Sequence, residues 1–406
     1  MIVQLLSETS ISNVTIPYEL WLDYSLFYGN VDFSSSSFEK KISFESSTFE
    51  QKANFNAIKS KDAIFFRNVK FNGYVDFVAA EIDGNFEADS AQFLSENDEA
   101  LFNSMKVDGH VKFANTKFHS PANFGRMNIS GNFEANGSSF ESNKKLVTYY
   151  DKTNRKYSYL FHGMKVGGGT LIRNTTFAGN FNMKDSSFES ISFDNIKFED
   201  NATNKDNKTL IKVNLTGMIY KHIYGIDNET KRKDFLERTE FNSDVYTTME
   251  TYFKSQGKTD DANKIYMEMK NKETKLMAVS YNWIYNKFNR WLTGHGRHPE
   301  YTFVPIFILF LLGCFFFKPK VMKSAESKEH LNTPEDNTLD QYMMTLYNRF
   351  WYSLDLFIPL VDLKIEKKYK PKDGHKVVLM YMHIHIIAGW ILVPIALLTI
   401  TGNLSK

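Results

Sequence analysis

The stretch "VDFSSSSFEKKISFESSTFE", residues 31–50, places a phenylalanine at every fifth or sixth position and fills the gaps mainly with serine, lysine and glutamate. Members of a pair such as Val31 and Phe33, two residues apart, point to the same face of an extended strand. The pair recurs every eleven residues, in the two sets Val31, Ile42, Ala53, Ile64, Val75 and Phe33, Phe44, Phe55, Phe66, Phe77. This spacing does not fit a helical heptad and predicts a repeating array of short strands.

A third set with the same spacing holds Phe38, Phe49, Phe71 and Ile82, and it is interrupted at Ser60, where Ile58 is a candidate replacement. Each unit then has a five-residue side and a six-residue side, and two units would close one four-sided coil of about 22 residues. Stacked coils bury a continuous apolar column that no single repeat could bury alone. We therefore predict that the five phenylalanines of the Phe33 to Phe77 set stack as one internal ladder.

This repeat resembles the bacterial pentapeptide-repeat family, whose chains wind into a right-handed, four-sided β-helix with inward-facing phenylalanine or leucine. The unit here departs from the family by one extra residue. The array continues at a longer period, since strings that begin Gly-Asn-Phe recur at Gly84, Gly131 and Gly179. We predict an N-terminal cap over residues 1–30 and a β-helix over 31–225, with the basic, tyrosine-rich segment 143–159 as a loop between coils.

Composition agrees with a phenylalanine-filled core, because 36 of the 406 residues are phenylalanine. The single cysteine, Cys314, leaves no disulfide within the chain and no multi-cysteine metal site, which is typical of a reducing compartment. The first 24 residues have no basic segment ahead of their apolar positions. We therefore expect no secretory signal peptide.

Past about residue 225 the pattern changes from strands to helices, and we predict a helical linker over residues 226–298. Apolar positions in 245–253 and 262–269 fit two helical faces with a turn at Gly257. This pair weakly resembles one tetratricopeptide-like unit, and a plain helical hairpin is the preferred interpretation.

Two uncharged apolar segments, residues 301–317 and 377–401, predict an α-helical transmembrane hairpin within a membrane module over 299–406. The first segment is short for a bilayer, because at about 1.5 Å per residue it spans roughly 25 Å. Between them, residues 343–363 are largely apolar but carry Arg349, Asp355 and Asp362. Charges at these positions make a full span costly and favour an interfacial or re-entrant segment.

The membrane module adds to the resemblance. Pentapeptide-repeat proteins with a two-span C-terminal module often carry a "YSLD…P.VDL" string between the spans and a "GW" in the second. Here the strings are "YSLDLFIPLVDL" from Tyr352 and "AGW" from Ala388. The resemblance implies a bacterial inner-membrane protein, and it implies little about activity.

Two arguments on orientation disagree. The missing signal peptide places the N-terminal domain and Lys406 in the cytoplasm, with residues 318–376 outside. That loop is rich in lysine, and the positive-inside rule would keep it in the cytoplasm. We give more weight to the missing signal peptide, since export of the β-helix would need a dedicated route.

Candidate functional residues lie in the membrane module, because ionisable groups within a span are costly unless they are used. They are His383 and His385 in the second span, Asp355 and Asp362 between the spans, and Trp390 in the "AGW" string. His383 and His385 cannot bind one ion together, since residues two apart on a helix point about 200° from each other. The two histidines are either packing residues or a proton-sensing ring in a pore. A second basic cluster, His295, Arg297 and His298, is a candidate for contact with lipid phosphate.

No phosphate-binding loop, nucleophile elbow, zinc spacing or dinucleotide fingerprint occurs, so we expect no enzyme activity, no cofactor and no metal site. Residues 31–200 carry nearly equal numbers of basic and acidic side chains. We therefore expect no nucleic-acid partner and no mimicry of DNA.

Two function classes remain. In the first, the β-helix is a cytoplasmic interaction scaffold or sensor that the spans tether to the membrane, with an unknown protein partner, lipid contacts and self-association into a homo-oligomer. In the second, the spans assemble into an oligomeric pore or membrane-perturbing effector that the β-helix gates. The scaffold is preferred, because no selectivity-filter string is present.

Overall fold

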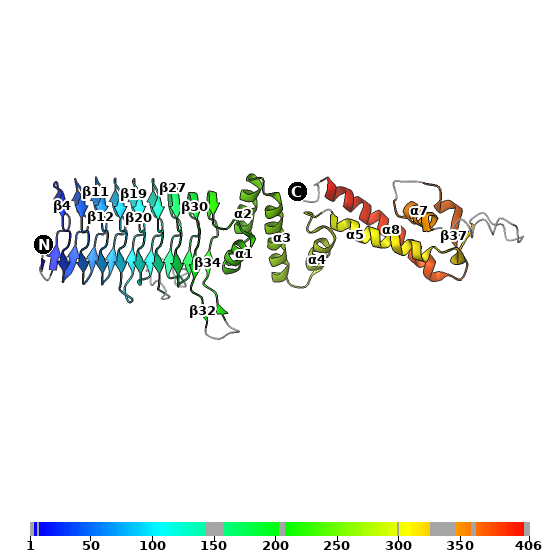
Figure 1. Cartoon of the computed structure of the whole chain (residues 1–406), viewed down its shortest axis with the longest axis horizontal. Helices are drawn as coiled ribbons and strands as arrows, with labels where there is room; N and C mark the ends of the chain where they lie inside the picture. Colours follow the sequence, from blue (N-terminus) through cyan, green and yellow to red (C-terminus); the bar gives the residue numbers. More distant parts are fainter. Residues whose placement is uncertain are drawn as a thin grey trace, which may run out of the picture. The chain divides into compact units, whose positions relative to one another are not determined.

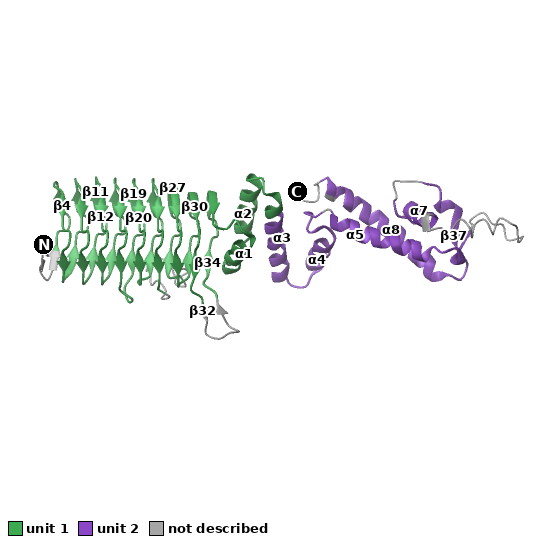
Figure 2. Ribbon diagram, in the orientation of Figure 1, with its two compact units in different colours: residues 1–262 green, residues 263–406 purple. Residues whose placement is uncertain are grey.

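The computed structural model describes residues 4–5, 8–142, 157–202, 208–298, 300–324, 346–358 and 363–401. These residues divide into two compact units, 1–262 and 263–406 (Figure 2). The first unit contains a parallel β-solenoid that is followed by helices, and the second is helical (Figure 1).

The solenoid confirms the predicted β-helix and its pitch of about 22 residues. One coil runs through four short strands, β6 (Asn30–Asp32), β7 (Ser37–Phe38), β8 (Ile42–Ser43) and β9 (Thr48–Phe49). The next coil starts with β10 (Ala53–Asn54), which pairs with β6 in parallel so that Val31 faces Ala53. Two eleven-residue units therefore make one coil, and each strand pairs with the strand one coil away.

Two of the strand columns form nine-stranded sheets. The first column is β1 (Gln4–Leu5), β5 (Leu26–Phe27), β9, β13 (Lys70–Phe71), β17 (Gln92–Phe93), β21 (Lys117–Phe118), β25 (Ser139–Phe140), β28 (Thr176–Phe177) and β31 (Lys197–Phe198). The second is β2 (Glu8–Ser10), β6, β10, β14 (Val75–Asp76), β18 (Ala100–Leu101), β22 (Ala122–Asn123), β26 (Tyr159–Leu160), β29 (Phe181–Asn182) and β34 (Val213–Asn214).

The other two columns belong to one 15-stranded sheet. One is β3 (Thr15–Ile16), β7, β11 (Lys59–Ser60), β15 (Glu81–Ile82), β19 (Lys106–Val107) and β23 (Asn128–Ile129), and the other is β4 (Leu20–Trp21), β8, β12 (Ile64–Phe65), β16 (Phe86–Glu87), β20 (Val111–Lys112) and β24 (Phe133–Glu134). They join because β27 (Lys165–Leu171), β30 (Ser187–Ser192) and β35 (Ile219–Tyr224) each run along both columns. A two-stranded hairpin, β32 (Asn201–Ala202) with β33 (Lys208–Thr209), extends from the last coils.

The described residues before residue 31 belong to the solenoid, with the first coil running from β2 to β5, whereas we predicted a separate cap over 1–30. Leu20 pairs with Ile42 and Thr15 pairs with Ser37, in the same 22-residue register as the later coils. The reason is visible in the eleven-residue spacing, since Leu20 lies eleven residues before Val31 and continues its set.

The five phenylalanines of the predicted ladder are all buried, but they lie in two columns and not in one. Phe33, Phe55 and Phe77 stack directly, with ring centroids 5.6 and 4.8 Å apart, and Phe44 stacks on Phe66 at 5.0 Å. Rings of the two columns meet edge to face, as Phe44 and Phe55 do at 5.5 Å. Because eleven residues are half a coil, successive members of the set alternate between opposite walls.

The third predicted set divides in the same way. Phe49 and Phe71 stack at 5.0 Å in the first strand column, as part of a column that runs from Phe27 to Phe177. Phe38 and Ile82 lie in the column of β7, where Ser60 stands between them. Ser60 is buried, and its hydroxyl donates to the carbonyl oxygen of Asp62 at 2.8 Å.

Serine fills corner positions because its hydroxyl joins neighbouring coils. Ser36 Oγ donates to the carbonyl oxygen of Ile11 at 2.6 Å, and Ser47 Oγ donates to that of Leu22 at 2.7 Å. The residue before each serine takes a left-handed conformation, with φ of 57° at both Ser35 and Ser46. The corner is therefore tight and internally hydrogen-bonded, which satisfies backbone groups that would otherwise be buried without partners.

Helices close the C-terminal end of the solenoid within the first unit. Helix α1 (Glu229–Arg238) packs Phe235 against the Phe193 ring at 5.0 Å, and α2 (Ser243–Ser255) follows it. Arg238 donates two hydrogen bonds to the Asp200 carboxylate at 2.6 and 2.9 Å. This arrangement covers the last apolar layer, as terminal caps do in solenoid proteins.

The predicted linker over 226–298 contains four helices. After α1 and α2 come α3 (Thr259–Leu276), which begins just after the expected turn at Gly257, and α4 (Tyr281–Thr293). The structure thus has two more helices in this range than the predicted hairpin.

The second unit contains α5 (Glu300–Phe316), α7 (Leu346–Phe357) and α8 (Lys376–Ile400). Short 3-10 turns at Pro319–Val321 (η2) and Glu366–Lys368 (η3) and an antiparallel pair, β36 (Met322–Ser324) with β37 (Tyr369–Pro371), lie between them. Because β36 follows α5 and β37 precedes α8, the two helices run side by side in opposite directions (Figure 1).

One described helix is long and apolar enough to cross a membrane, Lys376–Leu398 of α8. The predicted pair of spans is therefore not confirmed, because α5 has only 17 residues. Its length is about 25 Å, and a bilayer core is about 30 Å thick. Helix α7 covers the middle of the predicted interfacial segment 343–363, of which residues 343–345 and 359–362 lie outside the described residues.

Candidate functional site

Three helices of the second unit, α5, α7 and α8, enclose His385, whose side chain is fully buried. The rings of Phe310, Phe317 and Phe357 surround it, with centroids 5.1 to 6.3 Å away. A buried imidazole among aromatic rings is stable only if its nitrogens have partners.

Both nitrogens of His385 have partners on this unit. Nε2 lies 3.0 Å from the carbonyl oxygen of Ser353 and 3.0 Å from Ser353 Oγ. A carbonyl oxygen only accepts, so this contact places the ring proton on Nε2. Nδ1, the acceptor in this tautomer, lies 3.2 Å from the Tyr381 hydroxyl, whose oxygen also lies 2.8 Å from the carbonyl oxygen of Leu309. The hydroxyl donates its single proton to one of these two acceptors. His385 and Tyr381 therefore connect α8 to α7 and α5.

Two glycines let the helices approach this site. A Cβ on Gly313 of α5 would lie 2.2 Å from Ser353 Oγ, and a Cβ on Gly389 of α8 would lie 1.8 Å from the carbonyl oxygen of Phe357. Small residues at helix contacts allow such close backbone packing in membranes. The two residues of the "GW" string therefore differ in position. Gly389 contacts α7, whereas the side chain of Trp390 is 64% exposed.

Asp355 is buried at the end of α7, where it accepts backbone hydrogen bonds. Its two carboxylate oxygens accept from the amides of Leu363, Ile365 and Glu366 at 2.7 to 2.8 Å. The side chain therefore holds the segment after α7 against the helix. Asp362, the other predicted acidic residue, lies outside the described residues.

His383 lies on the exposed face of α8 with Trp390, away from His385. Large apolar side chains occupy the same face, among them Ile384 and Ile387 at 50% and 58% exposure. The structure thus separates the two predicted histidines, one into the packing of a single chain and the other onto its outer surface.

The predicted basic cluster before α5 is also divided. His295 is 4% exposed, and burial, together with the charges of Lys270 and Arg290, lowers its pKa to about 4. His298 Nδ1 lies 2.7 Å from Glu300 Oε1, and Arg297 lies over the Tyr266 ring. His295 therefore does not contact lipid phosphate as we had suggested, because its ring is buried.

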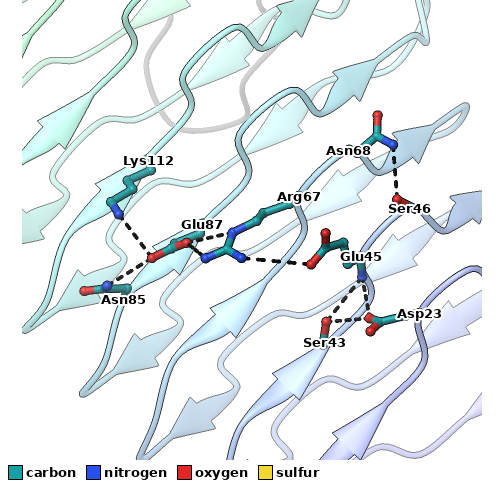
Figure 3. Close-up of polar contacts among 9 residues, drawn as sticks. All are labelled: Asp23, Ser43, Glu45, Ser46, Arg67, Asn68, Asn85, Glu87 and Lys112. Carbon is teal, nitrogen blue, oxygen red and sulfur yellow. Dashed lines mark hydrogen bonds and ion pairs between the residues drawn. The ribbon is translucent and has the colours of Figure 1, made fainter.

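On the solenoid, charged side chains form a network across successive coils (Figure 3). Glu87 accepts hydrogen bonds from Arg67 Nε at 2.9 Å, Asn85 Nδ2 at 3.1 Å and Lys112 Nζ at 3.3 Å. Burial opposes ionisation of Glu87, but these bonds outweigh it and lower the pKa of the carboxyl group. Arg67 also lies 4.0 Å from Glu45. The charges of this network are therefore paired locally.

The first coil carries a different surface, the aromatic set Tyr18, Trp21, Tyr24 and Tyr28, with exposed fractions of 51% to 77%. One coil later the corresponding positions hold Lys40, Ser43, Ser46 and Glu50. Aromatic side chains in the first coil therefore stand where the next coil has polar ones.

Sequence reasoning missed Ser353, Tyr381, Gly313 and Gly389 as members of the helical site. Ser353 lies in the "YSLD" string and Gly389 in the "AGW" string. Their roles could not be predicted, because they depend on how α5, α7 and α8 pack against one another. In the part of the chain that the structure describes, no three His, Cys, Asp or Glu side chains come together as a metal site would require. Comparison with known protein families, curated proteins and solved structures finds no match to this chain.

Proposed function

We propose that this chain is a membrane-anchored scaffold, in which a right-handed, pentapeptide-repeat-like β-helix binds a protein partner and the helical unit holds it at the membrane. The anchor consists of α8 as a full span and the shorter, antiparallel α5 as a second crossing, with α7 packed against both. In this proposal the β-helix and both chain ends are on the cytoplasmic side of a bacterial inner membrane.

The observation that carries the scaffold is the aromatic set of the first coil. Tyrosine and tryptophan are enriched at the centres of protein interfaces, where they supply large contact areas at a low cost in entropy. Trp21 is 57% exposed, and the matching positions in β8, β12 and β16 hold Ser43, Phe65 and Glu87. Such residues suit binding of a partner at the first coil.

The hydrogen bonds within the helical unit favour the membrane tether over the pore. His385, the strongest candidate for a proton-sensing ring, has partners for both nitrogens within its own chain. Asp355 is engaged by three backbone amides. These polar groups stabilise the packing of one unit, and of the two histidines only His383 lies on a surface where another subunit could meet it.

The scaffold is tested with a photo-crosslinking amino acid in the full-length protein in cells, at the exposed position 18 or, as the matched control one coil later, at the exposed position 40. We expect a discrete cross-linked product from position 18 and none from position 40. A second copy of the chain in that product would identify the partner as a homo-oligomer. Equal products from both positions, or none, would remove the first coil as the binding surface.

The pore is tested with the purified full-length protein after reconstitution into vesicles. A tether passes no ions between pH 5 and 8. A pH-dependent flux that His383→Ala abolishes would replace the scaffold with the pore. Reporter fusions at both chain ends test the orientation, since both should report the cytoplasm.

A further inference from the structure

Helix α4 presents an apolar face that the described chain leaves uncovered. Its exposed residues are Tyr281, Ile284, Tyr285, Phe288 and Trp291, with exposed fractions of 47% to 80%. At about 100° per residue they fall within one third of the helix circumference. Asn282, Asn286 and Arg290 lie on the opposite side. The helix is therefore strongly amphipathic, with the apolar face outward.

The ends of α4 are well defined, so this face is not the result of a fraying helix. Ser280 caps the first turn, and Gly294 ends the helix in a left-handed conformation. Leu292 is buried against Phe310 and Leu392, and its carbonyl oxygen accepts from Thr302 Oγ1 at 3.1 Å. The C-terminal end of α4 is thus attached to the packed ends of α5 and α8.

We propose that α4 lies in the headgroup region of a lipid bilayer, parallel to its surface, and sets the depth at which α5 enters. The inference rests on the proposed membrane anchor and adds to it the occupant of this face. Tryptophan and tyrosine gather at membrane interfaces, and amphipathic helices there combine an aromatic face with basic residues.

Two neighbouring features favour lipid as the occupant. Apolar exposure resumes in α5, where Phe303, Val304 and Phe307 are 49% to 60% exposed. Lys287 lies beside the apolar face, where it can reach lipid phosphates. An interfacial α4 also explains the short α5, since the segment between them then starts already within the interface.

The test measures the depth of single tryptophans in the full-length protein. One variant keeps only Trp291 and another keeps only Trp390, with the other four tryptophans changed to phenylalanine. Each is reconstituted into vesicles of phosphatidylcholine and phosphatidylglycerol that carry bromine either near the headgroup or deep in the acyl chains. We expect shallow bromine to quench Trp291 more than deep bromine does.

Substitutions on the two faces of α4 provide the matched pair. Phe288→Glu on the apolar face should reduce quenching of Trp291 to the level seen with unbrominated lipid, whereas Asn282→Glu on the polar face should leave it unchanged. Quenching of Trp390 should survive both, because α8 is a separate contact with lipid.

The outcomes separate this inference from the anchor itself. If Trp390 is quenched and Trp291 is not, the interfacial position of α4 is overturned and the anchor stands. If neither is quenched, the membrane anchor fails. If Trp291 is shielded from lipid and the mass in detergent is that of a dimer which Phe288→Glu dissociates, a second copy covers the face instead.

Discussion

Ser353 Oγ and His385 Nε2 lie 3.0 Å apart between α7 and α8, and both side chains are fully buried. Two residues before His385, His383 lies on the outer face of the same helix. The two histidines of α8 that suggested a functional site are therefore separated. His385 belongs to an internal hydrogen-bond network, and His383 lies on the surface.

His385→Ala should therefore destabilise the helical unit, by about 2–4 kcal/mol, because it removes a buried ring and its hydrogen bonds. His383→Ala should change stability by less than about 0.5 kcal/mol, as exposed substitutions usually do. Thermal unfolding of the full-length protein in detergent measures both. Equal losses of stability from the two substitutions would contradict a buried His385 and an exposed His383.

Gly389→Ala should weaken the contact of α7 with α8, because the added methyl group would lie 1.8 Å from a backbone carbonyl oxygen that cannot rotate away. We expect a loss of about 1–3 kcal/mol, typical of overpacking. Ile391→Ala, two residues on and 50% exposed, serves as the control. An unchanged unfolding temperature for Gly389→Ala would show that the helices are not packed so closely.

Neighbouring phenylalanines test the solenoid core. Phe66 is fully buried between Phe44 and Phe77, whereas Phe65 points outward, where Arg67 covers its ring at 4.7 Å. Phe66→Ala should cost about 3–5 kcal/mol through the cavity that it leaves. Phe65→Ala should cost about 1 kcal/mol or less. Urea unfolding followed by circular dichroism compares them, and a reversed order would refute the register.

The ion pair at the end of the solenoid tests the cap. Arg238→Met leaves the Asp200 carboxylate buried without its main partner, which should cost about 3–5 kcal/mol. The double variant Arg238→Met, Asp200→Leu should recover much of that loss, because apolar residues of similar size can replace a buried pair. Lys233→Met, at an exposed pair with Glu229, is the control. Additive losses in the double variant would argue against burial as the cause.

Acid should weaken the second unit through His295. Its pKa of about 4 in the folded chain lies below the value near 6.5 in the unfolded chain. As the pH falls from about 6.5 to 4, the unfolded chain binds a proton that the folded chain does not, so the free energy of unfolding decreases over this window and is retained above it. The loss should reach about 1–3 kcal/mol, at about 1.4 kcal/mol per pKa unit.

His295→Asn, which tolerates the left-handed φ of 57°, should flatten that dependence. Unfolding temperatures at pH 4, 5, 6 and 7 measure it. If the unfolding temperature of the variant depends on pH as steeply as that of the unchanged protein, a group other than His295 is responsible.

The predicted β-helix followed from the sequence alone, because each short strand must bury a residue at a fixed spacing and that spacing repeats along the chain. The division of Phe33 and Phe44 between opposite walls follows from the predicted coil, because eleven residues are half of it, although we predicted a single ladder. The tertiary structure decides how the rings meet, since pairing between residues 22 apart, such as Ala53 with Val75, stacks each ring on the ring one coil away.

The same limit applies to the helical unit. Sequence periodicity shows that α4 has an apolar face and that α8 is apolar throughout, because both properties are local to one helix. It does not show that His385 faces inward and His383 outward, or that α4 leaves its face uncovered. Those facts are decided by contacts between distant residues, above all the approach of Gly389 to the Phe357 carbonyl oxygen, which orients α8 against α7.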